Sequence, residues 1–260
     1  MYDKTDLIIL TDKVWQNSEK LFKSPNRKRK HSLKEILEAV LYVVKTGCQW
    51  RLLPACFPKW ELVYYYFSNW KREGLFEEIL DTVRNLLRKG LGREVSPSVG
   101  VIDSQSVKSA SYGGEKRGID GFKKVNGRKR HIITDTNGLL LSVVVHAANE
   151  YDGKMSFDVI KTLKFRFERM KKIFADGGYA GDELAKKVKT ELGYDLEIAL
   201  RSDKSTDFKP LPKRWVVERS FAWLNGFRRL SKDYEKLTET CEAFIMIAFI
   251  CLMLNNKIFQ

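Results

Sequence analysis

Apolar residues in the first third of the chain recur at the spacing of a helix. Between residues 33 and 46 they return every three or four positions, which is typical of an amphipathic helix. Ser32 and Glu35 have the spacing of an N-terminal capping box, and Gly47 suits the left-handed residue that follows a helix. Two more helices are expected, one after Pro58 to about Arg72 and one from Leu75 to Lys89. Residues 1–95 are therefore predicted to form an all-helical module, similar to a helix-turn-helix.

The period of the apolar residues changes beyond a Gly-, Pro- and Ser-rich stretch between residues 90 and 100. Residues 135–138 (Asp-Thr-Asn-Gly) are flanked by two apolar runs, which is the pattern of a β-hairpin. Strands are expected at 99–103, 130–134, 139–145, 172–176 and 196–201, and helices near 154–170, 182–192, 212–229 and 238–257. A hairpin followed by alternating helices and strands predicts an α/β fold for residues 96–260, with a mixed sheet and helices on its faces.

Aromatic side chains crowd the second predicted helix. Trp60, Tyr64 and Phe67 lie at i, i+4 and i+7, so they are interpreted as a stripe that faces the core. Tyr65 and Tyr66 lie outside this stripe, and stacking on nucleic-acid bases stays open for them.

Composition narrows the class of protein. Apolar residues make up 43% of the 260 residues, which excludes wholesale disorder. The longest apolar run, Ala243–Leu254, is too short to span a bilayer. The N-terminus lacks the pattern of a secretion signal, so a cytoplasmic protein with no membrane partner is expected. The cysteines have no zinc-ligand spacing and are interpreted as reduced core residues; they are Cys48, Cys56, Cys241 and Cys251.

The charge of the chain indicates its partner. Lys and Arg number 47 against 33 Asp and Glu, which gives a formal net charge of +14 and a pI near 9.5. So basic a protein most often binds a polyanion, usually nucleic acid. Two basic runs are expected to contact DNA phosphates, an arm before the first helix and a glycine-rich segment from Lys108 to His131. The residues predicted to make these contacts are Arg27, Lys28, Arg29, Lys30, Lys108, Arg128, Lys129 and Arg130.

Three acids are candidates for chemistry. Asp103 and Asp176 each end an apolar strand, a place where open α/β sheets hold reactive groups. Glu218 lies among apolar residues of a predicted helix, where a carboxylate is costly unless it is paired or binds a metal. The alternative for Glu218 is a buried ion pair with Arg214 or Arg229.

Three carboxylates on a basic protein suggest one consistent chemistry. Hard oxygen ligands suit Mg²⁺ or Mn²⁺, and two such ions can activate an attacking oxygen and stabilise the departing one in phosphodiester transfer. Gly177 and Gly178 remove side-chain bulk beside Asp176, so that a ligand or backbone can approach. Asp135 and Asp152 are better explained as turn acids. We therefore expect a site for two divalent ions.

Four motifs follow one another in the second region, and they are Asp103-Ser-Gln-Ser-Val-Lys108, Gly127-Arg-Lys-Arg-His131, Ala175-Asp-Gly-Gly-Tyr-Ala-Gly181 and Arg214-Trp-Val-Val-Glu-Arg219. Together with residues 30–33, 46–54, 63–67 and 229–235, they resemble the DDE transposases of bacterial insertion sequences, specifically insertion sequence family five. The resemblance covers nearly the whole chain, and four ordered motifs are far more specific than any one of them.

The resemblance implies a ribonuclease-H-like core in which Asp103, Asp176 and Glu218 are the catalytic, metal-binding acids. It also implies partners, because members of this family cut the ends of their own element and join the freed 3′-hydroxyl to target DNA. Pairing two ends suggests at least a dimer on DNA. Relatives often carry Tyr, Arg, Glu and Lys at fixed spacing around the glutamate. Here Leu211 and Asn225 replace the Tyr and the Lys, and Arg229 is the candidate substitute for the Lys and, with Arg214, a candidate DNA contact.

Two other functions would share the basic charge. A DNA-binding regulator derived from a transposase would gain nothing from three clustered carboxylates beside phosphates, so the acids favour the enzyme. A nuclease that cuts DNA without joining it would differ only in strand transfer.

Overall fold

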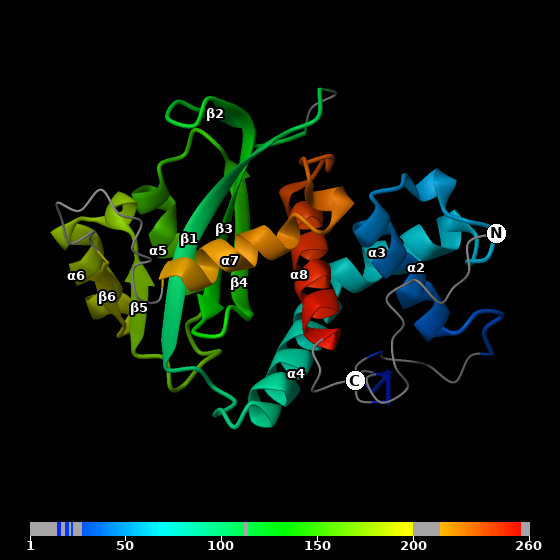
Figure 1. Cartoon of the computed structure of the whole chain (residues 1–260), viewed down its shortest axis with the longest axis horizontal. Coiled ribbons are helices and arrows are strands. Elements are labelled where there is room, and N and C mark those ends of the chain that lie inside the picture. The colour runs from blue at the N-terminus through cyan, green and yellow to red at the C-terminus, as the bar shows by residue number, and fades with distance from the viewer. Residues whose placement is uncertain are drawn as a thin grey trace. The chain divides into compact units, whose positions relative to one another are not determined.

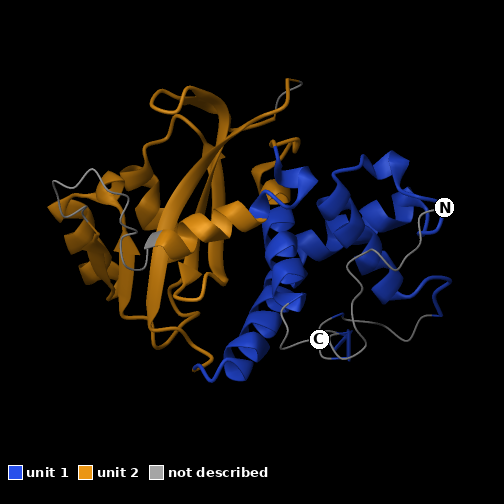
Figure 2. Cartoon of the chain, in the orientation of Figure 1, with its two compact units in different colours: residues 1–93, 224–231, 243–260 blue, residues 94–223, 232–242 orange. Residues whose placement is uncertain are grey.

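A computed structural model describes residues 15–16, 19–20, 22, 28–111, 114–199 and 214–255. The chain forms two compact units (Figure 2), one of residues 1–93, 224–231 and 243–260 and the other of residues 94–223 and 232–242. The helical unit thus takes two C-terminal segments that the sequence analysis assigned to the second domain. The reason is apolar packing, since Phe244 stacks on Phe67 with ring centroids 5.0 Å apart.

The helical unit contains the three helices expected from the apolar spacing. They are α2 (Leu33–Thr46), α3 (Trp60–Arg72) and α4 (Leu75–Gly90), and short 3-10 turns follow at η2 (Trp50–Leu52) and η4 (Arg228–Leu230). The capping box is confirmed, because Ser32 Oγ accepts a hydrogen bond from Glu35 N at 3.1 Å and Glu35 Oε2 accepts one from Ser32 N at 2.9 Å. Gly47 ends α2 with a φ of 72°, as a left-handed cap requires.

The aromatic stripe of α3 differs from the expected one. Val63, Phe67 and Trp70 are buried, whereas Trp60 is half-buried and Tyr64 is 46% exposed. The buried stripe therefore runs through positions 63, 67 and 70, and the prediction was right only for Phe67. Cys241 and Cys251 are buried core residues, as predicted. The same prediction was wrong for Cys48, which is half-buried, and for Cys56, which is exposed. Burial raises the pKa of both core thiols to about 12.

The second unit is built on a mixed sheet, as predicted (Figure 1). Its strands are β1 (Val99–Lys108), β2 (Gly118–Asp120), β3 (Val125–Asp135), β4 (Leu140–Ala147), β5 (Lys172–Ala175) and β6 (Asp195–Ile198). They run in the order β2–β3–β1–β5–β6, and β4 also pairs with β3. β3 is antiparallel to β1, β2 and β4, whereas β1, β5 and β6 are parallel to one another.

The hairpin between β3 and β4 forms where the sequence predicts it. Asp135 Oδ1 accepts hydrogen bonds from Asn137 N at 2.8 Å and Leu139 N at 2.9 Å, and Gly138 has a φ of 85°. Asp135 is therefore a turn acid, as expected. β1 extends five residues beyond its predicted end at Asp103, because β3 continues to pair with it as far as Lys108.

The remaining helices are α5 (Asp152–Lys161), α6 (Asp182–Leu192), α7 (Arg214–Leu224) and α8 (Thr238–Leu254). α5 and α7 end earlier than predicted, α5 before turns at 162–166 and α7 before the turn at Asn225 and Gly226. α5 and α6 cover one face of the sheet, where Ile102 and Ile133 pack with Val159 and Val188. Within the described ranges, no helix combines the length and the apolar character needed to cross a membrane.

Candidate active site

Asp103 lies in β1, and Asp176 directly follows β5, the parallel neighbour of β1. The two strands pair from Val99 with Lys172 to Val101 with Phe174. The same register, extended by two residues, would place Asp103 opposite Asp176. Asp176 thus lies at the carboxyl end of β5, where α/β sheets commonly bind ligands, whereas Asp103 lies in the middle of β1.

Both aspartates point away from the face that α5 and α6 cover. Ile102 and Ala175, which precede them, belong to the core on that face, and successive side chains of a strand alternate between faces. Figure 1 shows α7 passing over the sheet on the opposite side from α5 and α6. The pair of carboxylates thus lies on the face of the sheet that α7 crosses.

Local hydrogen bonds fix each carboxylate. Asp103 Oδ1 accepts a hydrogen bond from Ser104 N at 2.7 Å. Asp176 caps the 3-10 turn η3 (Gly177–Tyr179), and its Oδ1 accepts a hydrogen bond from Gly178 N at 2.8 Å. Both residues are half-buried, and these hydrogen bonds hold the orientation of each carboxylate.

Glu218 differs from the expectation of an acid enclosed by apolar residues. It is exposed, because the buried residues of α7 form a stripe on the other side of the helix; they are Val216, Val217, Ser220, Phe221 and Leu224. α7 is held to the β3–β4 turn by Ser220 Oγ, which donates to the Gly138 carbonyl at 3.1 Å, and by Arg219 Nη2, which donates to the Asn137 carbonyl at 2.9 Å. A buried Glu–Arg pair is excluded by the same exposure.

Two of the three predicted acids, Asp103 and Asp176, belong to β1 and to the end of its parallel neighbour β5. In the described part of the chain, no three His, Cys, Asp or Glu side chains lie close enough to hold a metal ion. The Asp103–Asp176 pair nevertheless fits Mg²⁺, which proteins commonly bind through one or two carboxylates while waters and substrate phosphate fill the other positions. Glu218 would complete a three-carboxylate site only after it moves toward this pair.

A buried polar network beneath the aspartates was missed by the sequence analysis. Asp152, interpreted there as a turn acid, begins α5 and accepts hydrogen bonds from Ser104 Oγ and Lys129 Nζ, both at 3.0 Å. Tyr179 Oη lies 2.8 Å from His131 Nε2, and His131 Nδ1 lies 3.3 Å from His146 Nε2. Histidines in the two neighbouring strands β3 and β4 were the available signal.

The direction of this hydrogen-bond chain follows from the neutral state of its histidines. Burial lowers the pKa of His131 to about 3 and also lowers the pKa of His146. His146 Nδ1 donates to the Ala147 carbonyl at 3.0 Å, so its Nε2 accepts from His131 Nδ1, and His131 Nε2 accepts from the Tyr179 hydroxyl. Burial and the nearby Asp103, Asp152 and Asp176 raise the pKa of Tyr179 well above its ordinary value, which keeps this hydroxyl protonated.

The network links the two segments that carry the aspartates. Ser104 directly follows Asp103, and Tyr179 ends the turn that Asp176 caps. Because Ser104 is held by the half-buried Asp152 and Tyr179 by the buried His131, the backbone at each aspartate is fixed from the opposite face of the sheet.

The basic residues of β3 are internal, which corrects their predicted role in DNA binding. Arg128 is 1% exposed, forms an ion pair of 3.0 Å with Asp233, and donates to the carbonyls of Glu115, Glu235 and Lys236. Lys129 is buried against Asp152, and Arg130 is buried beside Cys241. β3 is a central strand with both faces covered, so its side chains do not alternate between core and solvent. Of the predicted contacts in this segment, Lys108 is exposed.

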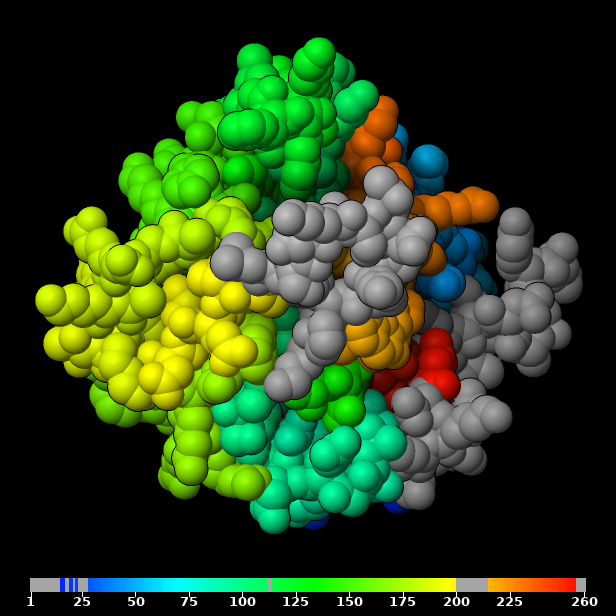
Figure 3. Space-filling model, turned by 60° about the vertical axis from the view of Figure 1, so that its left-hand side comes forward, coloured from blue at the N-terminus to red at the C-terminus, as the bar shows by residue number. Residues whose placement is uncertain are grey.

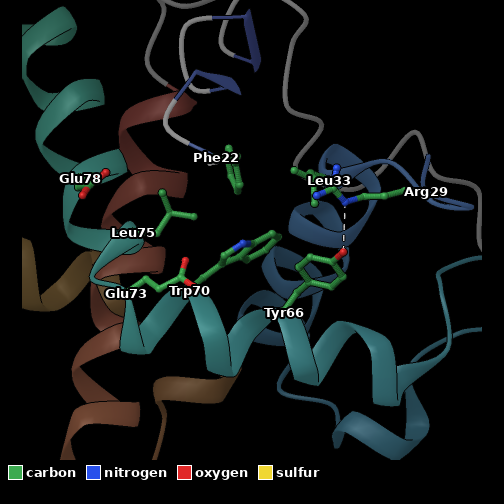
Figure 4. A pocket seen from close by; sticks show the side chains of 8 residues that line it. All are labelled: Phe22, Arg29, Leu33, Tyr66, Trp70, Glu73, Leu75 and Glu78. Atoms are coloured by element: carbon green, nitrogen blue, oxygen red, sulfur yellow. Dashed lines mark hydrogen bonds between the residues drawn. The ribbon is translucent and has the colours of Figure 1, made fainter. Parts of the chain in front are cut away.

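Some of the other predicted DNA contacts are exposed, and others are bonded within the protein. Lys28 and Lys30 are exposed, while Arg29 is half-buried and donates to the Tyr66 hydroxyl at 3.2 Å. Arg29 and Tyr66 line a small pocket of about 40 Å³ in the helical unit (Figure 4). Arg229 donates to the Cys48 carbonyl at 3.3 Å and lies over the Phe244 ring, so it does not replace the missing lysine near Glu218. Arg27 and the side chain of Arg214 lie outside the described residues.

The close approach beside Asp176 yields a prediction. A Cβ atom at Gly178 would lie 3.0 Å from Asp176 Oδ1, so Gly178→Ala is expected to turn the carboxylate and lower DNA cleavage about tenfold to a hundredfold. Gly181→Ala is the matched control, because a Cβ atom there meets nothing within 4 Å. Cleavage rates on one DNA substrate compare the two variants, and equal rates would show that the orientation of Asp176 does not limit the reaction.

The models of two protein families match parts of the chain. "Transposase DDE domain" matches residues 94–254, and "Putative transposase of IS4/5 family" matches residues 10–80. A Burkholderia cepacia protein named "Putative transposase for insertion sequence element IS402" is 30% identical over 161 residues, which cover 58% of this chain and 74% of that protein. No solved structure matches the chain.

Proposed function

The chain belongs to the DDE transposases of the IS4/5 type, and we propose that it cuts the ends of its own DNA element and joins them to target DNA in a divalent-metal-dependent reaction. The observation that supports this proposal is the parallel pairing of β1, which contains Asp103, with β5, which Asp176 directly follows. The family implies DNA as the substrate; the inverted repeats at the element ends and the assembly of at least two chains on them are parts of the proposal.

The arrangement of the sheet supports a ribonuclease-H-like catalytic domain. β1 is central, with antiparallel strands on one side and parallel strands on the other. Both aspartates come from the middle of this sheet, and α7 carries the third acid. These features agree with the core that the four sequence motifs imply.

Asp103 and Asp176 would hold one or two Mg²⁺ or Mn²⁺ ions together with phosphate oxygens of the DNA. When bound, such ions supply charge stabilisation for the attacking and the departing oxygen of phosphodiester transfer. Gly178 leaves the space that Asp176 needs, and the buried network of Ser104, Tyr179 and His131 keeps both carboxylates in place. We assign Glu218 as the third ligand, which reaches the pair by a movement of α7 when DNA is bound.

Exposed lysines would hold the DNA backbone. Lys108 ends β1, the strand that carries Asp103, and Lys28 and Lys30 precede the first helix of the helical unit. We propose that the helical unit binds the element ends, with these lysines on phosphates.

Incubation with a duplex that carries the inverted repeat beside the coding region tests the proposed function. With Mg²⁺ or Mn²⁺, we expect cuts at the repeat and products joined to a second DNA, and a chelator should abolish both. Cutting without joined products would indicate a nuclease, and binding without cutting would indicate a regulator; either result would contradict the proposal.

A further inference from the structure

A protruding hairpin tip, defined here as residues 116–124, consists of β2, the two residues before it and the turn that leads to β3. It lies at the top of Figure 1, and it forms the green projection at the top of the space-filling view (Figure 3). The tip belongs to the same compact unit as Asp103 and Asp176.

The conformation of the hairpin tip is fixed by a buried acid. Asp120 is 6% exposed and accepts hydrogen bonds from Phe122 N and Lys123 N, both at 3.0 Å, and from Ser106 Oγ. Burial alone would raise the pKa of Asp120, but these hydrogen bonds and the charge of Lys129 lower it. Asp120 therefore stays ionised and holds the turn in one conformation.

This rigid turn presents an aromatic ring to solvent. Phe122 is 99% exposed, and Ile119 on β2 is 62% exposed. A phenyl ring in this position gains no burial from folding. Single exposed apolar side chains are common on protein surfaces, so it is the rigid turn and the charges beside the ring that indicate a partner.

The charge around Phe122 indicates the kind of partner. The hairpin tip contains four exposed cations, Lys116, Arg117, Lys123 and Lys124. Its one acid, Asp120, is buried and bonded within the turn. A ring surrounded by cations, with no exposed anion in the tip, suits nucleic acid, where phosphates meet the cations and a base meets the ring.

The register of the sheet gives the distance from the hairpin tip to the aspartates. Asp103 pairs with Ile132 on β3, and Asp120 pairs with Val125. The seven steps from Val125 to Ile132 along β3 span about 23 Å at about 3.3 Å each. At about 3.4 Å per base pair, this length corresponds to about seven base pairs of duplex DNA.

We infer that Phe122 stacks on a base of the bound DNA about seven base pairs from the phosphodiester held at Asp103 and Asp176. The inference rests on the proposed function, because it takes the DNA at the aspartates as its reference point. The four cations hold the flanking phosphates, and the ring inserts at one base step, as apolar wedges do in other DNA-binding proteins.

A fluorescent adenine analogue, 2-aminopurine, tests this contact. It is placed in turn at positions around the predicted step of an inverted-repeat duplex, and every protein sample carries Asp103→Asn so that the DNA is not cut. We expect fluorescence to rise several-fold at one step, to stay unchanged from free DNA with Phe122→Ala, and to rise again with Phe122→Tyr. Phe122→Ala should also weaken binding about tenfold.

Two matched controls separate stacking from other effects. Phe165 is 91% exposed in a loop between α5 and β5, and Phe165→Ala should change neither fluorescence nor affinity. Replacing Lys123 and Lys124 by Gln should lower the salt dependence of binding by about two in slope, whereas Phe122→Ala should leave the slope unchanged.

The inference would be overturned if fluorescence rose as much with Phe122→Ala as with Phe122 intact. It would also be overturned if Phe165→Ala lowered the fluorescence and the affinity as much as Phe122→Ala does. Because Asp103→Asn is present throughout, the outcome depends only on DNA contact. Failure of the stacking contact is thus distinguishable from failure of cleavage by the intact protein, which is measured separately.

Discussion

Replacing Asp103 or Asp176 by Asn is expected to lower DNA cleavage at least about a thousandfold while leaving DNA affinity nearly unchanged. Each aspartate supplies carboxylate oxygens that the neutral amide cannot replace, since a divalent cation needs their negative charge. The amide has nearly the same shape, and its oxygen can still accept the hydrogen bond from Ser104 N or Gly178 N. The fold should therefore survive. Single-turnover cleavage and DNA affinity, measured on the same duplex, separate the two effects.

The matched control for these variants is Asp182→Asn. Asp182 is an exposed acid at the start of α6, six residues after Asp176, and its replacement should leave cleavage within a factor of about two. Glu218→Gln should behave like the two aspartate variants if α7 brings Glu218 to the pair. Cleavage that stays within tenfold of the intact protein for Asp103→Asn and Asp176→Asn would contradict the assignment of both acids.

Arg128→Met is expected to lower the free energy of unfolding by about 3–5 kcal/mol. The substitution keeps an unbranched apolar stem but removes the cation that pairs with the buried Asp233. It also removes the donors to three backbone carbonyls. An unpaired buried carboxylate and carbonyls without donors both destabilise the folded state. Urea unfolding followed by circular dichroism measures the change.

Two further variants make this prediction specific. Lys108→Met replaces an exposed cation on the neighbouring strand and should change stability by less than about 0.5 kcal/mol. Adding Asp233→Leu to Arg128→Met should recover part of the loss, because no charge is then left buried without a partner. If Arg128→Met were as stable as the intact protein and instead weakened DNA binding, Arg128 would be a phosphate contact after all.

The elements of the fold were predictable wherever local signals were strong. The capping box at Ser32, the glycine after α2 and the turn from Asp135 to Gly138 each fix a boundary through bonds between close neighbours in sequence. The order of strands and helices then indicated a mixed sheet. The parallel pairing of β1 with β5 was not predicted, because β2, β3, β4 and α5 lie between these strands in the sequence.

The roles of charged residues were less predictable, because their partners are distant in sequence. Arg128 pairs with Asp233, 105 positions away, and nothing near Arg128 in the sequence indicates that partner. A run of basic residues is interpreted as exposed to solvent unless both faces of its strand are known to be covered. The predicted burial of Glu218 was wrong because its apolar neighbours in sequence lie on the other side of α7. Such neighbours enclose a helical residue only when they lie on its own side.

Asp103 and Asp176 are proposed to bind the divalent ions of the reaction together. Anomalous X-ray scattering from crystals of the protein grown with inverted-repeat DNA and Mn²⁺ would locate these ions. We predict a manganese peak within bonding distance of carboxylate oxygens of both aspartates, with Glu218 moved to the same site. Manganese bound elsewhere, with none at this pair, would contradict it.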